Sequence, residues 1–498
     1  MNLLVSAFMV KYGYKDVLTM FDYLIIGSGI IGSAIARELS KYQLSLILVE
    51  KESDITNGQT IANSAIIHSG HDPKVGTLKA KLSVLGNKLY EELAKKLDFP
   101  LLETGALVVA YSEEEKAILS ELYQRALVNG VVNPKLLDKE ETLKLEPNLN
   151  ENLLGSLSLP STKTTVPWEA SRAMIENAIT NGLILELNHE VIGIKRTNDF
   201  YEVIFKNKPS IKTKHVINAA GLFSDEIMQM IEKDVIQIYP RRGEYYTLSH
   251  QSSGFVNHVI YPVPSSLGKG VLLTPQPDGH ILIGPNAEDV PTKYHNETTK
   301  TGLRYIKEQS KKLSSKIPFQ ENIKNFAGLR AKTKLDDFYI EESSDNPGFY
   351  HLVGIDSPGL TAAPAIAKYL VDKILTKNPL VLKENFIEER QKLVLFHQDT
   401  IENKKKRYQE KPLYGEVICR CENITKQDII DEINGLVPAE TIKALKKRTR
   451  VTAGLCQGGY CESRVLEIIS EVTKKPLDEI NYYEEDTKIL VKIEKVNQ

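Results

Sequence analysis

The pattern of apolar and polar positions predicts an α/β chain. Apolar runs of strand length at residues 22–26 and 46–49 flank an alanine-rich segment with helical spacing, and this order is typical of a parallel sheet. Helical spacing recurs over residues 82–97, 113–129 and 363–375. Short strands separated by turns between residues 236 and 325 predict a second, largely antiparallel sheet.

Three glycines, Gly27, Gly29 and Gly32, follow the first strand, and the second strand ends at Glu50. This pattern predicts a dinucleotide site. Gly27 permits a tight turn, Gly29 lets the backbone approach a pyrophosphate, and Gly32 lets the helix pack on the strand. The helix N-terminus favours the pyrophosphate, and Glu50 accepts hydrogen bonds from a ribose, which disfavours NADP. A glycine triplet alone is often only a turn, so the prediction depends on the order of the surrounding elements.

Later segments extend this site. A loop of small polar residues follows Glu50, and such a loop is either an ordinary surface loop or a path for a flat ligand. Two further strand-to-helix turns occur near Gly221 and near Gly359 and Leu360. A ligand that recruits several distant segments is long and buried, which favours FAD over a smaller dinucleotide.

Composition narrows the class of protein. A chain of 498 residues is long enough for two or three domains, and a net charge of −2 without a basic stripe argues against a nucleic-acid partner. The apolar run at the N-terminus is too short to span a membrane, and no other segment resembles a transmembrane span. Because Met20 directly precedes the first strand, residues 1–19 are interpreted as an extension from an upstream start codon.

All four cysteines, Cys419, Cys421, Cys456 and Cys461, lie in one short region. This crowding indicates a local metal site in a reducing, cytoplasmic compartment rather than a disulfide framework. Four thiolates are the usual ligands of a [2Fe–2S] cluster. Zinc is the alternative, but structural zinc sites favour two-residue gaps in both cysteine pairs, so the cluster is the preferred prediction. Structural cysteines without metal are a third interpretation.

Two resemblances make these predictions specific. The glycine triplet with Glu50, residues 218–221 and the turn at 357–361 resemble the FAD-dependent oxidoreductase family of D-amino-acid oxidase type. The stretch at residues 62–73 is similar to the glycerol-3-phosphate dehydrogenase and oxidase branch, although Ala65 and His71 stand where glycine and tyrosine are expected. Residues 416–470 resemble the bacterioferritin-associated-ferredoxin-like [2Fe–2S] module. Together they resemble the large subunit of anaerobic glycerol-3-phosphate dehydrogenases.

The resemblance implies a Rossmann-like FAD-binding domain interleaved with a largely antiparallel substrate sheet, plus a small C-terminal helical iron–sulfur module. We predict five segments: an N-terminal extension (1–20), the FAD-dependent oxidoreductase domain (21–375), a helical connector (376–412), the [2Fe–2S]-binding domain (413–475) and a C-terminal tail (476–498).

The resemblance also implies roles for individual residues in holding FAD. The ADP part lies on the glycine turn with Glu50, and the flavin lies on the later segments. The predicted FAD-binding residues are Gly27, Gly29, Gly32, Glu50, Thr60, Asn63, Ser64, Val191, Gly221, Gly359 and Leu360.

Oxidation of a secondary alcohol by a flavin needs a base for the hydroxyl proton, and an anionic substrate needs a fixed cation. His68 is the preferred base, with His71 as the alternative, although a lone histidine is more often structural. Arg330 is the preferred cation because a guanidinium holds phosphate or carboxylate with two hydrogen bonds. Most arginines only solvate a surface, but Arg330 lies in an apolar, glycine-containing context. Residues that assist it are Arg241, Arg242 and Lys332.

These observations predict an enzyme that oxidises glycerol 3-phosphate to dihydroxyacetone phosphate. Its small anionic substrate reduces FAD, and the cluster passes electrons to a protein subunit or a quinone. Alternatives are another 2-hydroxy acid or amino acid such as L-2-hydroxyglutarate, an oxygen-using oxidase, or a non-enzymatic iron–sulfur redox sensor or assembly subunit. The predicted location is the cytoplasm, with peripheral association at the inner face of the cell membrane.

Overall fold

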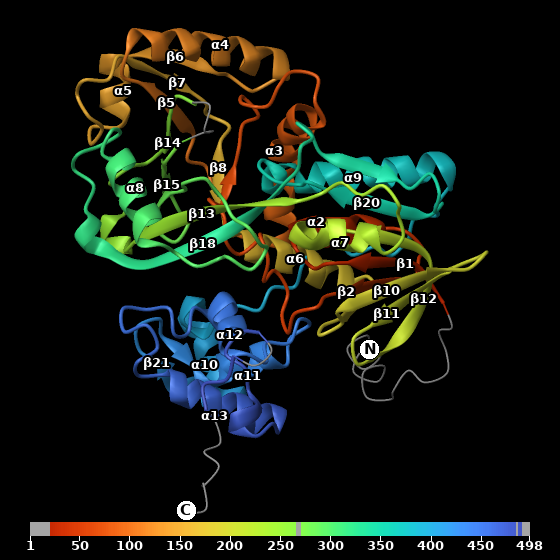
Figure 1. The fold of residues 1–498 in the computed structure, drawn as a ribbon. Coiled ribbons are helices and arrows are strands. Elements are labelled where there is room, and N and C mark those ends of the chain that lie inside the picture. The colour runs from red at the N-terminus through yellow and green to blue at the C-terminus, as the bar shows by residue number, and fades with distance from the viewer. Residues whose placement is uncertain (1–19, 265–269, 485–486, 491–498) are drawn as a thin grey trace, which may run out of the picture.

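Three bodies make up the chain in the computed structural model, which describes residues 20–264, 270–484 and 487–490 (Figure 1). A nucleotide-binding sheet with its helices lies beside a second sheet, and a small helical module carries the C-terminal part of the chain. The predicted extension at residues 1–19 lies outside the described residues.

The first sheet has eight strands and is parallel at its centre, where β12, β1, β2 and β9 are neighbours. Its strands are β1 (Phe21–Ile26), β2 (Leu46–Val49), β9 (Leu183–Glu186), β10 (Val191–Arg196), β11 (Tyr201–Phe205), β12 (Lys208–Asn218), β19 (Tyr339–Glu342) and β20 (Phe349–Val353). Strands β1 and β2 are apolar on both faces because helices or other strands cover both sides of a parallel sheet.

Four helices form one hydrophobic core with this sheet: α2 (Ile30–Leu39), α3 (Leu78–Leu97), α6 (Pro167–Thr180) and α9 (Gly359–Lys377). Helices α3 and α9 approach closely at Gly86, where a Cβ atom would lie 2.0 Å from the Thr361 carbonyl oxygen. On the other face lie the short helix α7 (Ser224–Gln229) and the strands β10 and β11.

The second sheet has nine strands and is antiparallel except where β14 pairs with β5. Its strands are β5 (Ala106–Ala110), β6 (Lys135–Asp138), β7 (Gly155–Ser158), β13 (Tyr239–Leu248), β14 (Val259–Pro262), β15 (Leu272–Pro275), β16 (Ile281–Gly284), β17 (Glu288–Asp289) and β18 (Asn322–Lys332). Around it lie α4 (Glu113–Asn129), α5 (Lys139–Leu145) and α8 (Lys300–Ser310). A three-stranded sheet of β3 (Ile66–Ile67), β8 (Lys163–Thr165) and β4 (Leu101–Leu102) completes the domain.

The segment between the domains differs from the predicted helical connector. Only α10 (Ile401–Glu410) is an α-helix there, and residues 378–400 are mostly irregular. Side chains of α6 and of the residue that follows this helix bind the backbone of this irregular segment instead. Asn177 and Asn181 donate to the Ile387 carbonyl, and buried Arg390 pairs with Glu176 at 2.6 Å. These distant partners replace the hydrogen bonds that a helix would supply.

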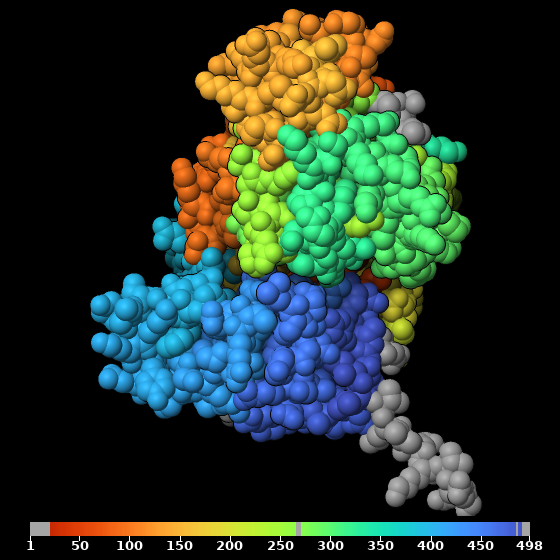
Figure 2. All heavy atoms as spheres, turned by 90° about the vertical axis from the view of Figure 1, so that its left-hand side faces the viewer, coloured from red at the N-terminus to blue at the C-terminus, as the bar shows by residue number. Residues whose placement is uncertain are grey.

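The C-terminal module has its own hydrophobic core. It comprises β21 (Val417–Cys419), β22 (Ile424–Thr425), α11 (Lys426–Ile433), α12 (Ile442–Thr449) and α13 (Glu462–Thr473). Residues predicted to form a tail contribute to this core, since Ile480 is buried in it and Tyr482 packs against it. Figure 2 shows the module packed against the underside of the larger part of the molecule. Each helix of the described chain is too short or too polar to cross a bilayer.

Candidate functional site

The turn from β1 to α2 is shaped by two glycines that the protein itself requires. Gly27 has φ +102°, and a Cβ there would lie 2.6 Å from the Ala219 carbonyl oxygen. A Cβ at Gly32 would lie 1.9 Å from the Gly27 carbonyl oxygen. A Cβ at Gly29, by contrast, would meet only the Thr60 hydroxyl oxygen within 4 Å among the described residues, at 3.3 Å. The protein therefore crowds Gly29 less than Gly27 and Gly32, and the turn fits the close approach of a pyrophosphate such as that of FAD.

Glu50 ends β2 beside this turn and is buried. Its Oε2 accepts hydrogen bonds from the Ser28 N–H at 2.9 Å and the Ser28 hydroxyl at 2.7 Å. Its Oε1 accepts from the Glu52 N–H at 3.1 Å. A carboxylate has about four acceptor positions, so these bonds orient Glu50 and still leave capacity for a ribose.

Other predicted FAD residues gather at the same edge of the sheet. The His189 N–H donates to the Glu50 carbonyl at 2.8 Å, which places the start of β10 at Val191 next to the ribose position. Gly221 has φ +57°, and a Cβ there would lie 3.2 Å from the Gln59 amide oxygen. The structure therefore brings the loop after Glu50 and the return turn at Gly221 together.

The loop at residues 59–65 is held by its own side chains. Thr60 accepts from the Ile30 N–H at 2.9 Å, which joins the loop to the N-terminus of α2. The Asn63 amide donates to the Gln59 and Thr60 carbonyls and accepts from the Ala65 N–H at 2.7 Å. Asn63 thus shapes the loop. Ala65 has φ +61°, a conformation that favours glycine, which explains why glycine was expected there.

His68 follows β3 and lies beside the first turn of α9. Its N–H donates to the Thr361 hydroxyl at 2.9 Å, and Thr361 comes directly after Gly359 and Leu360. Its Nδ1 lies 3.0 Å from the Tyr261 hydroxyl oxygen. Burial raises the pKa of Tyr261 well above its ordinary value, so this phenol stays protonated and serves as a neutral partner that orients the imidazole.

The alternative base, His71, is buried and bonded to a neighbour. Its Nδ1 lies 3.1 Å from the Ser69 hydroxyl, and its ring packs edge-on against Tyr261. Tyr261 therefore contacts both histidines, and no local sequence pattern predicts this contact, because β14 lies far along the chain from the segment after β3. Thr361 lies within the turn that signalled FAD, but nothing in the sequence placed it against His68.

Arg330 differs from the arginines expected to assist it. Arg241 forms two hydrogen bonds with Asp289, at 2.6 and 2.8 Å. Buried Arg242 pairs with Glu288 at 2.8 Å and with Glu297. Within the described residues, no carboxylate lies within 4.0 Å of Arg330. Two neighbours of Arg330 are thus already neutralised, and the Arg330 guanidinium remains for a substrate anion. Lys332 is the one assisting cation that also lacks such a pair.

The four cysteines converge in pairs. The Cys421 and Cys456 sulfurs are 3.7 Å apart and exposed, whereas Cys419 and Cys461 are buried. Burial, and then the adjacent Cys419 thiol, raises the pKa of Cys461 to about 11. In the described chain no three ligating side chains surround a single point. Two separate pairs fit a [2Fe–2S] cluster, which takes two thiolates at each iron, better than one zinc ion.

Glycine is required beside these cysteines. A Cβ at Gly454 would lie 2.3 Å from the Cys421 Cβ, and Gly458 has φ +91°. The close approach of the loop to Cys421 therefore depends on glycine.

Ion pairs hold the module against the FAD-binding part. Lys447 and Arg448 of α12 each pair with buried Asp54 at 2.6 Å, and Lys447 also donates to the Ile55 carbonyl. Burial opposes the ionisation of Asp54, but the charges of Arg448 and Lys447 outweigh it and lower the pKa to about 2. The loop after Glu50 is thereby fixed by the module.

A second contact ties the cysteine region to the substrate sheet. Arg450 bridges Glu422 and Asp278, at 2.9 and 2.8 Å. Because Glu422 directly follows Cys421, this bridge fixes the position of the cysteines relative to the sheet that carries Arg330.

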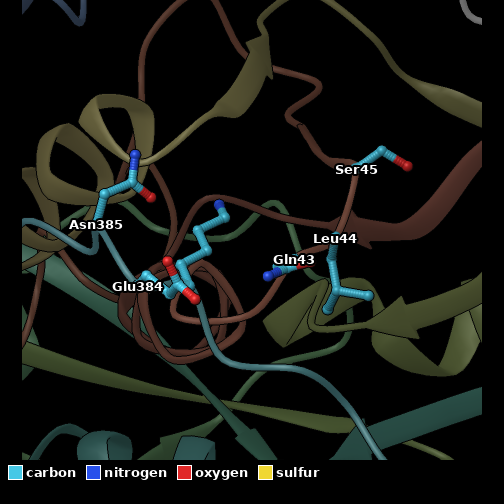
Figure 3. A pocket seen from close by; sticks show the side chains of 6 residues that line it. Gln43, Leu44, Ser45, Glu384 and Asn385 are labelled. Atoms are coloured by element: carbon cyan, nitrogen blue, oxygen red, sulfur yellow. The ribbon is translucent and has the colours of Figure 1, made fainter.

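One surface hollow lies away from this site. It measures about 770 Å³ and is lined by Gln43, Leu44, Ser45, Lys383, Glu384 and Asn385 (Figure 3). It opens at the start of β2, opposite the carboxyl ends of the parallel strands where dinucleotides bind. It is therefore not the candidate active site.

Comparison with known proteins defines the class. Residues 22–373 match the family model "FAD dependent oxidoreductase", and the chain belongs to this family. Residues 417–471 match the "BFD-like [2Fe-2S] binding domain". The predicted fold class and both predicted cofactors, FAD and a [2Fe–2S] cluster, are thereby confirmed. The individual site residues stay predictions.

Particular relatives are more informative. The chain is 43% identical over 473 residues to glycerol 3-phosphate dehydrogenase of Caloramator mitchellensis, covering 95% of this chain and 98% of the relative. It is 34% identical to human mitochondrial L-2-hydroxyglutarate dehydrogenase, over 54% of this chain and 61% of the relative. Among solved structures, FAD-bound L-α-glycerophosphate oxidase from Mycoplasma pneumoniae matches with a TM-score of 0.71 and 35% identity, covering 75% of this chain and 98% of the other.

Proposed function

We propose that this chain is an FAD-dependent dehydrogenase that oxidises glycerol 3-phosphate to dihydroxyacetone phosphate. The observation that carries the proposal is the guanidinium of Arg330, which has no carboxylate within 4.0 Å among the described residues and lies on a sheet that packs against the loop at residues 59–65. A dianionic phosphate is the natural partner of such a group, and the relative from Caloramator mitchellensis bears the same activity in its name.

Arg330 and His68 have separate roles in the proposed reaction. Arg330 binds the substrate phosphate with two hydrogen bonds and so orients the C2 hydroxyl. His68, held by Tyr261 at Nδ1, accepts the hydroxyl proton, and we assign this role to Nε2. FAD bound at the glycine turn beside Glu50 would supply the hydride acceptor, and a [2Fe–2S] cluster held by the four cysteines would supply a one-electron path to an external acceptor. The substrate thus loses one proton and one hydride.

The exposed side of the cluster site supports an external electron acceptor. Cys421 and Cys456 are exposed, and beside Cys456 the side chains of Leu455 and Tyr460 are 70% and 83% exposed. Apolar side chains at a redox centre suit a transient contact with a protein subunit or a quinone at a membrane surface. We place the enzyme in the cytoplasm, associated peripherally with the inner face of the membrane, because its thiols must stay reduced to bind iron.

A second substrate class has a specific observation in its favour. Arg330 also suits a carboxylate, and human L-2-hydroxyglutarate dehydrogenase is a relative. The holoenzyme is therefore mixed anaerobically with glycerol 3-phosphate, L-2-hydroxyglutarate or glycine, and flavin absorbance is followed. We expect rapid bleaching only with glycerol 3-phosphate. Bleaching by L-2-hydroxyglutarate alone would replace the proposed substrate, and no bleaching by any compound would favour a sensor. Reoxidation by air would identify an oxidase.

A further inference from the structure

Four helices that lie together in Figure 1, α2, α3, α6 and α9, border a cavity of about 130 Å³. Phe386 and Glu388, from the irregular segment after α9, also line it. Arg37 lines the cavity from the C-terminal end of α2, and the eight residues from Gly29 to Arg37 span roughly 12 Å of helix. The cavity is therefore separate from the glycine turn where the pyrophosphate is expected.

Most of the cavity wall is apolar. The apolar side chains that line it include Leu89, Leu93, Met174, Pro364, Ala367 and Phe386. An apolar cavity of about 150 Å³ is large enough to bind benzene, so this space suits a ligand of about six non-hydrogen atoms. Such a wall favours a ligand with a short hydrocarbon part.

Arg37 differs from the rest of the wall because its guanidinium is buried without a partner. Arg37 is 6% exposed, and among the described residues its guanidinium donates no hydrogen bond and has no carboxylate within 4.0 Å. Its Cζ lies 6.0 Å from the centre of the Phe386 ring. Burial lowers the pKa of Arg37 more than the nearby acids raise it, and an arginine nevertheless keeps its charge at neutral pH. A buried cation whose donors are all unused is unfavourable unless an acceptor enters the cavity.

The other charged groups of the lining already have partners. The ion pairs are Lys41–Glu38, Lys96–Glu92, Lys96–Glu388 and Lys368–Asp372, with N–O distances of 2.7, 2.7, 2.7 and 3.1 Å, respectively. The side chains of Glu92 and Glu388 are also 63% and 58% exposed, so water solvates both acids. The acids nearest to Arg37 are thus neutralised by lysines, and Arg37 lacks one negative charge.

We propose that this cavity binds a short monocarboxylate. Its carboxylate accepts two hydrogen bonds from the Arg37 guanidinium, and its hydrocarbon chain packs against Phe386 and Met174. A single negative charge matches the single unpaired cation. The wall disfavours glycerol 3-phosphate, because the second phosphate charge and the hydroxyl groups of that compound would be buried without partners. The inference does not depend on which substrate reduces the flavin.

The first test titrates the holoenzyme calorimetrically with butanoate, which has six non-hydrogen atoms. The unaltered protein and Arg330→Gln should both bind one butanoate per chain with similar affinity. Adding Arg37→Met to Arg330→Gln should weaken binding at least about tenfold, because the charged hydrogen bonds are lost. The matched control is Arg304→Met, at an exposed position of α8, and it should change nothing.

Three results of these titrations would overturn the proposal. If the unaltered protein bound no butanoate, the cavity would hold only water. If Arg330→Gln alone abolished binding, the ligand would lie at the active site. If Arg37→Met and Arg304→Met bound butanoate equally well, the carboxylate would lie away from Arg37.

The second test needs no change at Arg37, so it holds even if Arg37→Met fails to fold. The unaltered holoenzyme is titrated with 1-butanol, which has the same hydrocarbon chain as butanoate and no charge. We expect 1-butanol to bind at least about tenfold more weakly than butanoate, and equal affinity would overturn the role of Arg37. Saturating glycerol 3-phosphate should leave butanoate binding unchanged, and displacement of butanoate would overturn the separate site.

Discussion

The flavin site and the cluster site are built in opposite ways. Around the flavin position, backbone meets backbone at Gly27 and Gly32, and Tyr261 orients His68 from a buried position. At the cluster position, two of four cysteines are exposed, and Leu455 and Tyr460 stand largely in solvent.

The difference follows from the two kinds of transfer. Hydride and proton transfer need reacting atoms within about 3.5 Å and correctly oriented, so their site must be tightly supported. Electron transfer needs a short path and a surface that a partner can reach. One chain therefore combines a buried, tightly packed flavin site with a cluster site that an electron acceptor can reach from solvent.

The largest expected effect tests the buried flavin site. His68→Asn should lower the rate constant of flavin reduction by roughly 1,000-fold, because it removes the group that we propose as the base for the hydroxyl proton. Single-turnover mixing with glycerol 3-phosphate measures this rate directly. The companion variant His71→Asn should lose far less; an equal or greater loss there would transfer the role to His71.

The next largest expected effect distinguishes Arg330, which has no carboxylate partner among the described residues, from an arginine that is already paired. Arg330→Gln should lower kcat/KM by about 100-fold, or roughly 3 kcal/mol of transition-state binding, because it removes the guanidinium that we propose to hold the phosphate with two hydrogen bonds. Arg241→Gln should change kcat/KM much less, since that guanidinium is already bound to Asp289. Similar losses in both variants would show that the phosphate is held elsewhere.

A smaller expected effect tests whether the C-terminal module stabilises the FAD site. Lys447→Met removes the Lys447 ion pair with Asp54 and its hydrogen bond to the Ile55 carbonyl but leaves the pair between Arg448 and Asp54, so FAD should bind about tenfold more weakly. Flavin fluorescence on dilution measures the dissociation constant, with Lys406→Met as the control. FAD affinity equal to that of the control would mean that the loop needs no support from the module.

The smallest expected effect concerns the exposed surface beside the cluster cysteines, where we propose that the electron acceptor binds. Tyr460→Ser should raise KM for reduction of the acceptor in isolated membranes about threefold, since an exposed aromatic anchor is lost. Ferricyanide, a small ion that needs no docking surface, should be reduced at an unchanged rate. If ferricyanide reduction fell equally, Tyr460 would be acting on the cluster rather than on docking.

Local patterns made much of this organisation predictable. The glycines of the first turn, Glu50 and the cysteine spacing are short-range signals, because their chemistry depends on adjacent residues. The contacts of Tyr261 with His68 and of Lys447 with Asp54 join segments that are far apart in sequence, so no local pattern encodes them.

The same reason explains where the structure differs from the predictions made from the sequence. Arg241 and Arg242 were expected to assist the substrate, but strand pairing brings acidic partners of β17 to both. Residues 378–400 form no α-helix because side chains of α6 and of the residue after it bind part of their backbone. Ile480 is buried in the module core although its surroundings in the sequence are highly charged.

We propose that electrons pass from the flavin site to the cysteine-held cluster. The most direct measurement is an anaerobic titration of the holoenzyme with glycerol 3-phosphate, without external acceptor, followed by optical and electron paramagnetic resonance spectra. The account predicts flavin bleaching together with the signal of a reduced [2Fe–2S] cluster, and bleaching alone in Cys421→Ser. A bleached flavin beside a cluster that stays fully oxidised in the unaltered protein would contradict it.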